Sequence, residues 1–436
     1  MRALILVFTA LLFGNGRAVA ESCPAPPDVI LAPVNIVDVE RGAVRKNRGL
    51  VLSKGQIAEE FDAARASRVA RLRPGTARID GEGAFVLPGL FDMHVHALWD
   101  ASAPAPFFAQ FLAYGVTSVR DMGGDSKTAI AVRGQMARCE INAPTIWFPG
   151  PFLDGPQPVD PELSIALETP EQARAAVSDL AARSVDFIKA YSLLSANVLD
   201  AVVVAADEQG LRVAGHVPAA AGVTDAVLKF ASIEHPAIEI GGFCPSSQRE
   251  ACAAVFQDMI AAGVAQTPTL VARETSTRIA SPTFKEEPAV ERLPEVVRAY
   301  WRREQKKGAA RATDEWRAAR RQSLAHARWM TGELSRLGAI LLAGSDAGNP
   351  YVEPGVSLHE ELALLVAAGL SEREALEAAT STPAKFMMRP DLGRIAPGAS
   401  ADLVLLRRNP LQRIENTRTI IATFKGGLYI APPATE

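Results

Sequence analysis

The sequence predicts an α/β protein with a (β/α)8 TIM-type barrel and a small β-sandwich domain built from both ends of the chain. Between residues 89 and 391, apolar strand-like runs alternate with helical patterns, which is typical of parallel βα units. The flanks, 21–88 and 392–436, instead contain short apolar runs separated by glycine, proline and charged residues. With 436 residues, 48% of them hydrophobic and 22% charged, the chain has the composition of a soluble globular protein and the length for more than one core.

The end domain is predicted from apolar runs that have the character of strands joined by turns. Such runs occupy residues 34–38, 49–52 and 77–80 in the first flank, and 401–406 and 419–427 in the second. Because the two flanks match in character, one composite β-sandwich domain is the simplest interpretation.

The barrel region contains eight strand-like segments, the first of which ends at His94 to His96. The other seven occupy residues 115–122, 145–148, 185–191, 211–216, 231–235, 266–271 and 339–346. Helical patterns lie between them; the one over 171–182 follows a capping Thr169 and Pro170. Eight such units can close into a barrel, whose strand ends converge on the face that carries the active site.

The polar, arginine-rich stretch from about 282 to 337 is too long for an ordinary βα connection. It is interpreted as a helical excursion over the barrel mouth. Two hypotheses stay open for it: a lid over the site, or a solvated helix pair without a role.

Residues 1–20 have the pattern of a secretory signal peptide. Arg2 gives a positive start, residues 3–13 are apolar, and Ala18 to Ala20 form a small-residue cleavage site. The apolar run is shorter than the ~20 residues that a spanning helix needs, so we expect no membrane span. The expectation is a secreted or periplasmic protein, cleaved after Ala20.

Four cysteines in an exported chain allow three fully paired connectivities, and the sequence does not select one. Cys244 and Cys252 are close enough to clip a loop, which would leave Cys23 with Cys139. Free buried thiols are the alternative, although an oxidising compartment favours at least one bridge.

Polar residues at the strand ends point to a metal centre. His94 and His96 stand two apart, so in a strand both imidazoles project to the same face and can reach one ion. Imidazole and carboxylate groups are ligands of Zn²⁺. Further polar residues end the fourth, fifth, sixth and eighth predicted strands: Lys189, His216, His235 and Asp346.

Lys189 is the unusual member, because an ammonium group cannot bind a metal. Burial near cations favours the neutral amine, which can add carbon dioxide to form an anionic carbamate that bridges two ions. The alternative is a salt bridge from Lys189 to Asp186 or Glu234. We expect the carbamate, because Lys189 lies one strand before two histidines.

The chain resembles the amidohydrolase superfamily over nearly all of residues 21–436. The resemblance is carried by PGLFDMHVH at 88–96, DFIK at 186–189, GHVP at 215–218, IEH at 233–235, AGSDA at 343–347 and LGRIAPGASADLV at 392–404. It is greatest to the branch of imidazolonepropionase-like proteins and Xaa-Pro dipeptidases. The small residues before Asp402 depart from the family's commoner tail, which affects no ligand.

The resemblance implies a binuclear metallohydrolase with two divalent ions, expected to be zinc. It assigns His94, His96 and Asp346 to one ion, His216 and His235 to the other, and N6-carboxylated Lys189 to both. Two cations lower the pKa of a bridging water, and the resulting hydroxide attacks the carbonyl. Asp346 accepts the proton of the water and delivers it to the leaving nitrogen.

Three functions are therefore weighed. The preferred one is a secreted dipeptidase, carboxypeptidase or N-acyl-amino-acid amidase that acts on a dipeptide or another small molecule. The second is a cyclic-amide or ester/lactone hydrolase, and the third a metal-binding protein without turnover. The net charge of −3 gives no basic surface for nucleic acid, and the sequence leaves open whether the chain forms a homo-oligomer.

Residues outside the ligand series are harder to assign. Tyr191 shares a face with Lys189, so its hydroxyl could donate to a substrate carboxylate or its ring could only pack. Arg120 would pair with a carboxylate or with Asp121. His359 is expected to be structural or at the rim, and His326 to lie at the surface unless a lid brings it inward.

Overall fold

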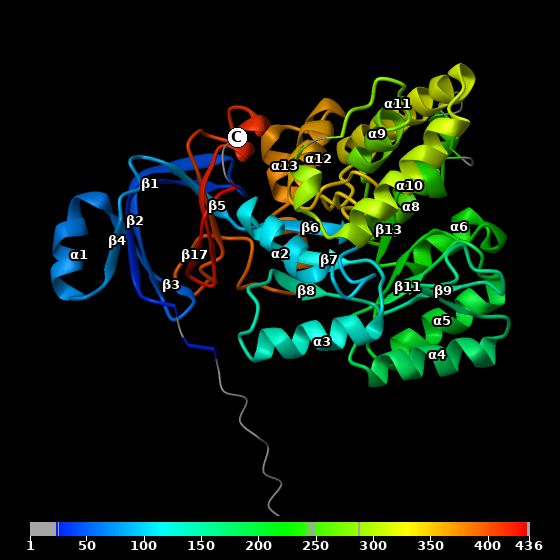
Figure 1. Ribbon diagram of the computed structural model, residues 1–436, viewed down its shortest axis with the longest axis horizontal. Coiled ribbons are helices and arrows are strands. Elements are labelled where there is room, and N and C mark those ends of the chain that lie inside the picture. The colour runs from blue at the N-terminus through cyan, green and yellow to red at the C-terminus, as the bar shows by residue number, and fades with distance from the viewer. Residues whose placement is uncertain (1–22, 25, 242–243, 246–248, 287, 434–436) are drawn as a thin grey trace, which may run out of the picture.

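The computed structural model describes residues 23–24, 26–241, 244–245, 249–286 and 288–433. The predicted signal peptide therefore lies outside the described residues. Figure 1 shows two regions side by side: a sheet made by both ends of the chain, and an α/β unit that contains the middle of the chain. None of the helices in this described part is long and apolar enough to span a membrane.

The two flanks build one sheet of eight strands. Its strands are β1 (Val29–Asp38), β2 (Ala43–Ser53), β3 (Gln56–Asp62), β4 (Ala77–Ile79), β5 (Phe85–Pro88), β15 (Leu403–Leu406), β16 (Ile420–Lys425) and β17 (Leu428–Ile430). Their order is β17-β16-β15-β5-β1-β2-β3, with β4 beside β1. β5 pairs antiparallel with β15 and parallel with β1, so the two flanks meet at β5.

This end sheet supports the predicted composite β domain in part. Both flanks do contribute strands, and the sheet encloses its own apolar core, which includes Leu31, Ile36, Leu52, Leu403 and Phe424. However, seven of the strands follow one continuous hydrogen-bonded path, with β4 branching from β1, and these described strands do not form two separate sheets. The strands are also longer than predicted, because polar residues such as those of 43–48 join the ladder through their backbone.

The α/β unit contains two parallel sheets. The smaller one consists of β6 (Leu90–Val95), β7 (Val116–Asp121) and β8 (Thr145–Trp147). The larger one consists, in sequence order, of β9 (Phe152–Asp154), β10 (Ser164–Ala166), β11 (Ile188–Ala190), β12 (Val213–Gly215), β13 (Ser232–Glu234) and β14 (Ala265–Thr267). The pair β9 and β10 was not expected from the sequence.

The eighth predicted strand, 339–346, forms no continuous ladder, but its backbone lies between β14 and β6. Only isolated bridges form there, at Leu341 and Ala347. Even so, its backbone is hydrogen-bonded on both sides: Leu342 N–H donates to Gln266 O at 2.9 Å, and Asp346 N–H donates to His94 O at 2.7 Å. The described strands therefore form two parallel sheets, and no continuous hydrogen-bonded ladder joins them into a closed barrel.

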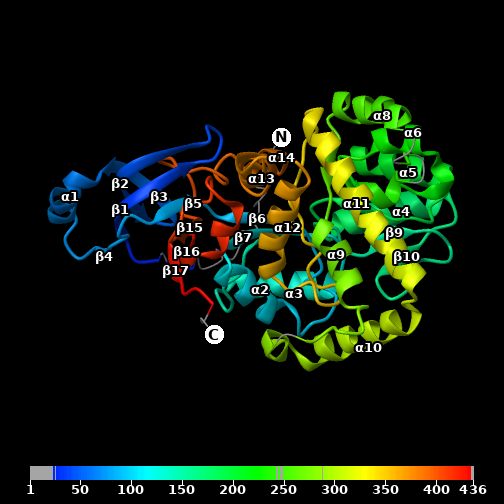
Figure 2. The same ribbon diagram turned by 90° about the horizontal axis from the view of Figure 1, so that it is seen from above.

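The helices of the α/β unit cover the outside of these sheets (Figures 1 and 2). Their bounds are α2 (Pro104–Ala113), α3 (Ser126–Ala137), α4 (Pro170–Ala182), α5 (Ala196–Glu208), α6 (Val223–Ala226), α7 (Pro236–Glu239), α8 (Arg249–Ala261), α9 (Leu270–Arg278), α10 (Glu295–Arg311), α11 (Asp314–Arg336), α12 (Val356–Ala367), α13 (Glu372–Ala378) and α14 (Ser381–Phe386), while α1 (Ala66–Leu72) belongs to the end sheet. The predicted cap of α4 is confirmed, because the Thr169 side chain accepts a hydrogen bond from Gln172 N–H.

Short 3₁₀ helices connect several of these elements: η1 (Ala63–Arg65), η2 (Ala219–Ala221), η3 (Val227–Lys229), η4 (Pro288–Arg292) and η5 (Ile414–Arg418). The long excursion consists of η4, α10 and α11. Because α11 packs against α9 and α12, the excursion is part of the α/β unit. Figure 2 shows α10 and α11 along the outside of that unit.

Both pairs of cysteines form disulfides. Cys23 is joined to Cys139 and Cys244 to Cys252, and no free cysteine remains. This is the pairing that the short spacing of Cys244 and Cys252 suggested. The Cys23 bridge ties the start of the described chain to the end of α3.

Candidate metal centre

The polar residues that the sequence singled out lie at the ends of neighbouring strands. Because parallel strands end at one edge, these side chains converge on the same face of the α/β unit. His94 lies within β6 and Lys189 within β11. Three histidines directly follow the ends of β6, β12 and β13: His96, His216 and His235. Asp346 lies in the segment between β14 and β6.

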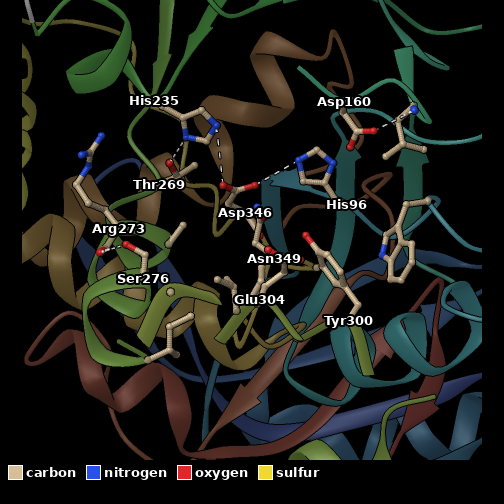
Figure 3. A pocket seen from close by; sticks show the side chains of 18 of the residues that line it. His96, Asp160, His235, Thr269, Arg273, Ser276, Tyr300, Glu304, Asp346 and Asn349 are labelled. Atoms are coloured by element: carbon tan, nitrogen blue, oxygen red, sulfur yellow. Dashed lines mark hydrogen bonds and ion pairs between the residues drawn. The ribbon is translucent and has the colours of Figure 1, made fainter. Parts of the chain in front are cut away.

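Asp346 is at the centre of this group. Its Oδ1 lies 3.4 Å from His94 Nε2 and 3.3 Å from His96 Nε2, and its Oδ2 lies 3.9 Å from His235 Nε2. Figure 3 shows His96 and His235 on either side of the Asp346 carboxylate. His94, His235 and Asp346 offer ligand atoms that all lie within 4.8 Å of one another, which is the spacing of groups around one ion.

Lys189 and His216 lie at the edge of this group. The His216 ring centroid is 5.1 Å from that of His235, and Lys189 Nζ is 5.8 Å from the centroid of Tyr191. Both residues line the same cavity as His235 and Asp346. A glycine permits this approach: a Cβ at Gly215, the residue before His216, would lie 2.0 Å from Ala190 O.

The four imidazoles each make a polar contact through Nδ1, and the Nε2 atoms of His94, His96 and His235 face Asp346. This pattern fixes the ring orientation and leaves the Nε2 lone pair for a ligand, as in metal sites. The Nδ1 partners are Glu234 for His94 (2.8 Å), Gly123 O for His96 (3.3 Å), Glu239 for His216 (3.0 Å) and Thr269 Oγ1 for His235.

Three atoms facing the centre are buried without a hydrogen-bond partner: His94 Nε2, Lys189 Nζ and Asp346 Oδ1. His94 Nε2 and Asp346 Oδ1 contact each other at 3.4 Å but form no hydrogen bond. Buried polar groups normally have a hydrogen-bond partner, so three such atoms in one place indicate a missing partner. One imidazole nitrogen, one carboxylate oxygen and one amine nitrogen are also the atoms predicted to bind metal, the amine after carboxylation. The residues present therefore fit a divalent-metal centre.

The charges of the group are set by burial and by its own members. Burial lowers the pKa of His94 to about 4 and holds those of His216 and His235 well below the usual value. Burial would raise the pKa of Asp346, but His94, His96 and His235 hold it below its ordinary range. The carboxylate is thus ionised beside imidazoles that are mostly neutral, which suits metal binding.

Lys189 makes neither of the two salt bridges that were considered for it. Asp186 instead pairs with Arg133 at 2.5 Å, and Glu234 pairs with Arg120 at 2.8 Å. Burial lowers the pKa of Lys189 to about 8. Its amine is consequently easier to deprotonate than an exposed lysine, as carbamate formation requires.

Arg120 and Glu234 form a buried pair that sequence reasoning did not assign. Arg120 does not pair with Asp121; its guanidinium reaches Glu234 Oε1, Ser232 Oγ and Met93 O, each at 2.8 Å. Burial would raise the pKa of Glu234, but Arg120 and His94 hold it well below its ordinary value. The ionised Glu234 can therefore orient His94. The sequence did show Glu234 next to His235 in the IEH run, but it could not show its partner Arg120, which lies 114 residues away.

A cavity of about 900 Å³ opens over the group. The excursion forms part of its wall, through Val296 and Tyr300 of α10 and Trp316 and Arg320 of α11. The helix pair is thus not a solvated appendage. Trp301 is fully buried and anchors α10, because its indole N–H donates to Gly348 O at 3.0 Å, two residues after Asp346.

Tyr191 lines this cavity as well. Its ring stacks on Phe152 at 4.8 Å and lies 4.2 Å from the His216 ring, so it has a packing role. Burial raises the pKa of its hydroxyl, which therefore stays protonated and able to donate at neutral pH. The predicted contact with a substrate carboxylate stays a prediction.

The two remaining histidines lie outside the group. His359 is buried in α12, with Nε2 2.9 Å from Tyr114 O and Nδ1 3.0 Å from Thr417 Oγ1, which confirms the structural alternative. His326 of α11 is half-buried and stacks on Trp329 at 5.3 Å. It is therefore not fully at the surface.

An imidazole and carboxylate cluster at the ends of parallel strands, under a large cavity, is typical of metal-dependent enzymes. The sequence matches the amidohydrolase family over residues 85–429. Because this match covers most of the chain, the protein belongs to the amidohydrolase family, whose members are hydrolytic enzymes that act on carbon–nitrogen bonds.

Solved structures show the same fold. One is the bottromycin amidohydrolase, with 25% identity and a TM-score of 0.74, covering 94% of this chain and 88% of that chain. Another is a Xaa-Pro dipeptidase with methionine bound in its active site, with 21% identity and a TM-score of 0.71, covering 93% and 100%.

Curated relatives match only a short part of the chain. The adenine deaminase of Thermosipho africanus is 33% identical over 93 residues, which is 21% of this chain and 15% of the deaminase. A similar match to the adenine deaminase of Staphylothermus marinus covers 22% and 15%. These matches are therefore local and span a small fraction of either protein.

Proposed function

We propose that this protein is a secreted binuclear metal-dependent hydrolase that cleaves the amide bond of a dipeptide or an N-acyl amino acid. The observation that carries the proposal is the set of buried atoms without a hydrogen bond, His94 Nε2, Lys189 Nζ and Asp346 Oδ1, beside imidazoles whose Nδ1 atoms already have polar partners. Similarity to the bottromycin amidohydrolase supports amide hydrolysis, and the dipeptidase with the same fold motivates the dipeptide alternative.

The donor set suggests how two ions would be held. His94, His96 and Asp346 would bind one ion, and His216 and His235 the other. Zinc suits these nitrogen and oxygen donors. When bound, the two ions would supply an acidified water and polarise the scissile carbonyl.

Lys189 would link the two halves of the site after modification. Its neutral amine attacks the carbon of carbon dioxide, a C–N bond forms, and one amine proton passes to solvent, which leaves a carbamate anion. The lowered pKa and the lack of a hydrogen-bond partner at Nζ both support this step. An unmodified lysine at this position would place an uncompensated amine among ligands.

The protein's other groups would position and move protons. Asp346 takes the proton of the attacking water and delivers it to the leaving nitrogen. Glu234, held by Arg120, keeps His94 in the orientation that presents Nε2. Tyr191 lines the cavity, and its hydroxyl, which stays protonated, would donate to the substrate.

The proposal includes two further points from the sequence. Export after cleavage at Ala20 accords with the two disulfides, which persist in oxidising compartments. The segment 339–347, hydrogen-bonded to both β14 and β6, would serve as the eighth strand of a (β/α)8 barrel.

The test is the substitution Asp346→Asn in the metal-loaded enzyme. Turnover of dipeptides and N-acyl amino acids should fall at least about 100-fold, because the proton acceptor is lost, while the thermal midpoint stays near that of the wild type. Asp179→Asn, at an exposed position of α4, is the matched control. A near-normal rate in Asp346→Asn, or wild-type turnover of a lactone panel only, would contradict the proposal.

A further inference from the structure

Two arginines of the cavity wall have no acidic partner. Arg273 of α9 and Arg320 of α11 both line the cavity, and neither forms an ion pair with any carboxylate in the described part of the chain. Arg273 donates a hydrogen bond to Ser323 Oγ of α11, and the Arg320 guanidinium lies 4.9 Å from the ring centroid of Trp316. These contacts hold both side chains in place, but no carboxylate neutralises either guanidinium by direct contact.

Several arginines of α10 and α11 are paired with carboxylates. Arg298 contacts Glu291, Arg302 contacts Glu286, and Arg317 contacts Asp314. These pairs use the acidic residues of the excursion. Of the arginines that line the cavity, Arg303 pairs with its neighbour Glu304, whereas Arg273 and Arg320 form no ion pair within the described residues.

The two cations lie on the wall of the same cavity. Burial lowers the pKa of Arg273, and the positive charge of Arg320 lowers it further. Glu239 partly offsets this, but its carboxylate is used by His216 Nδ1 at 3.0 Å and by Val217 N–H at 3.1 Å. A bound anion would offset the two positive charges through charge-assisted hydrogen bonds.

The cavity has a second, aromatic wall. Trp99 and Tyr300 pack together at 5.5 Å, and Phe152 lies 6.1 Å from the His96 ring. Figure 3 shows Arg273 on the His235 side of Asp346 and Tyr300 on the His96 side. A substrate whose carbonyl lies over Asp346 would therefore extend one end toward the arginines and the other toward the aromatic rings.

We propose that Arg273 and Arg320 bind the carboxylate of the amino-acid half of the substrate. The inference rests on the proposed function and assigns the two residues that recognise the free carboxylate next to the leaving nitrogen of its substrates. The acyl half then lies against Trp99, Phe152 and Tyr300. A cavity of about 900 Å³ is at the upper end of the roughly 300–1,000 Å³ of small-molecule sites, so a bulky apolar acyl group fits.

The test compares N-benzoyl-L-leucine with N-benzoyl-L-leucinamide, which differ only in the carboxylate. Benzoate release is measured for the metal-loaded wild type, Arg273→Gln and Arg320→Gln. Each variant should lose about 10- to 100-fold in kcat/KM for the acid, with little change for the carboxamide. Arg317→Gln is the matched control on α11, because the charge of Arg317 is already paired with Asp314. This substitution should change kcat/KM only slightly, and by the same factor for the acid and the carboxamide.

Binding gives a readout that does not depend on turnover. N-benzoyl-L-leucine is titrated by calorimetry into metal-loaded Asp346→Asn protein with and without Arg320→Gln. The Kd should rise about 10- to 100-fold with the second substitution. An unchanged Kd, absent binding, or equal losses for acid and carboxamide would overturn the carboxylate site. Intact, arginine-dependent binding without hydrolysis by the wild type would instead contradict the proposed function alone.

Discussion

Three residues around the candidate metal centre hold a left-handed backbone. The φ angles of His235, Thr269 and Asp346 are 52°, 47° and 65°. Non-glycine residues pay roughly 1–3 kcal/mol for such sparsely populated conformations, which persist only where the surroundings enforce them. Their concentration at one site shows that the fold, and not local preference, sets the direction of these side chains.

Thr269→Val tests the support of His235. The change keeps the shape of the side chain but removes the hydroxyl that contacts His235 Nδ1, so the ring loses its orienting partner. Metal affinity, measured by competition with a chelator, should fall about 10-fold or more. Thr277→Val, whose hydroxyl bonds only the Arg273 carbonyl within α9, should leave affinity unchanged. Equal affinities in both variants would refute the role of Thr269.

His359 gives a pH-dependent contribution to stability. Burial lowers its pKa to about 4, whereas the unfolded value is near 6.5. As the pH falls, the unfolded state binds a proton at His359 near pH 6.5, whereas the folded state binds it only near pH 4. The stability present above pH 6.5 is therefore lost as the pH falls toward 4. Between pH 7 and pH 5 this loss should reach about 2 kcal/mol for this one group.

The check is urea unfolding of the metal-free wild type and His359→Gln at pH 7 and pH 5. The wild type should lose more free energy of unfolding on acidification than the variant, by about the amount above. Since His359 lies away from the candidate centre, metal binding does not enter the comparison. Parallel losses in the two proteins would show that the buried imidazole titrates normally.

At the scale of elements, the sequence predicted the βα alternation well, but long-range pairing limits what it could show. Strand ends at Lys189, His216 and His235 followed from apolar runs that stop at a polar residue. The predicted strand 266–271 ends early at Thr267, because Thr269 turns left-handed and α9 begins at Leu270. No local pattern separates these alternatives.

The contacts that orient the site were the part that the sequence could not give. Arg120 and Glu234 meet across 114 residues, and the Asp346 carboxylate meets the β6 histidines from about 250 residues away. Residue types and spacing identify which groups are suited to a metal. Only the folded chain shows that Nδ1 of each imidazole already has a polar partner.

The excursion is tied to the site by Trp301 of α10. Trp301→Phe keeps an aromatic ring in the buried position but removes the hydrogen bond to Gly348 O. We expect KM to rise about 2- to 10-fold with unchanged metal content, because the cavity wall shifts while the ligands stay. Loss of metal in this variant would mean that α10 supports the centre itself.

At the scale of the whole molecule, the end sheet and the α/β unit are linked at several points. Lys425 of β16 contacts Asp402 and Thr145 Oγ1 at the start of β8, each at 2.7 Å, and η5 packs against α12 and α13. The Cys23–Cys139 disulfide adds a covalent link between residues 116 apart. The unit that carries the site is therefore held by both ends of the chain.

Removal of the long disulfide should destabilise the protein more than removal of the short one. Closing a longer loop restricts the unfolded chain more, so Cys23→Ser with Cys139→Ser should cost about 2–4 kcal/mol, and Cys244→Ser with Cys252→Ser less. Calorimetric melting of the two double variants measures the difference. The opposite order would contradict the argument from loop length.

The most direct test of the central claim is the metal content of the purified wild-type chain and Lys189→Ala, measured by elemental analysis after growth with zinc. The account predicts two equivalents of divalent metal per wild-type chain, and a fall toward one or none in Lys189→Ala with the fold retained. A folded wild-type protein without stoichiometric metal, or a Lys189→Ala protein that still holds two ions, would contradict it.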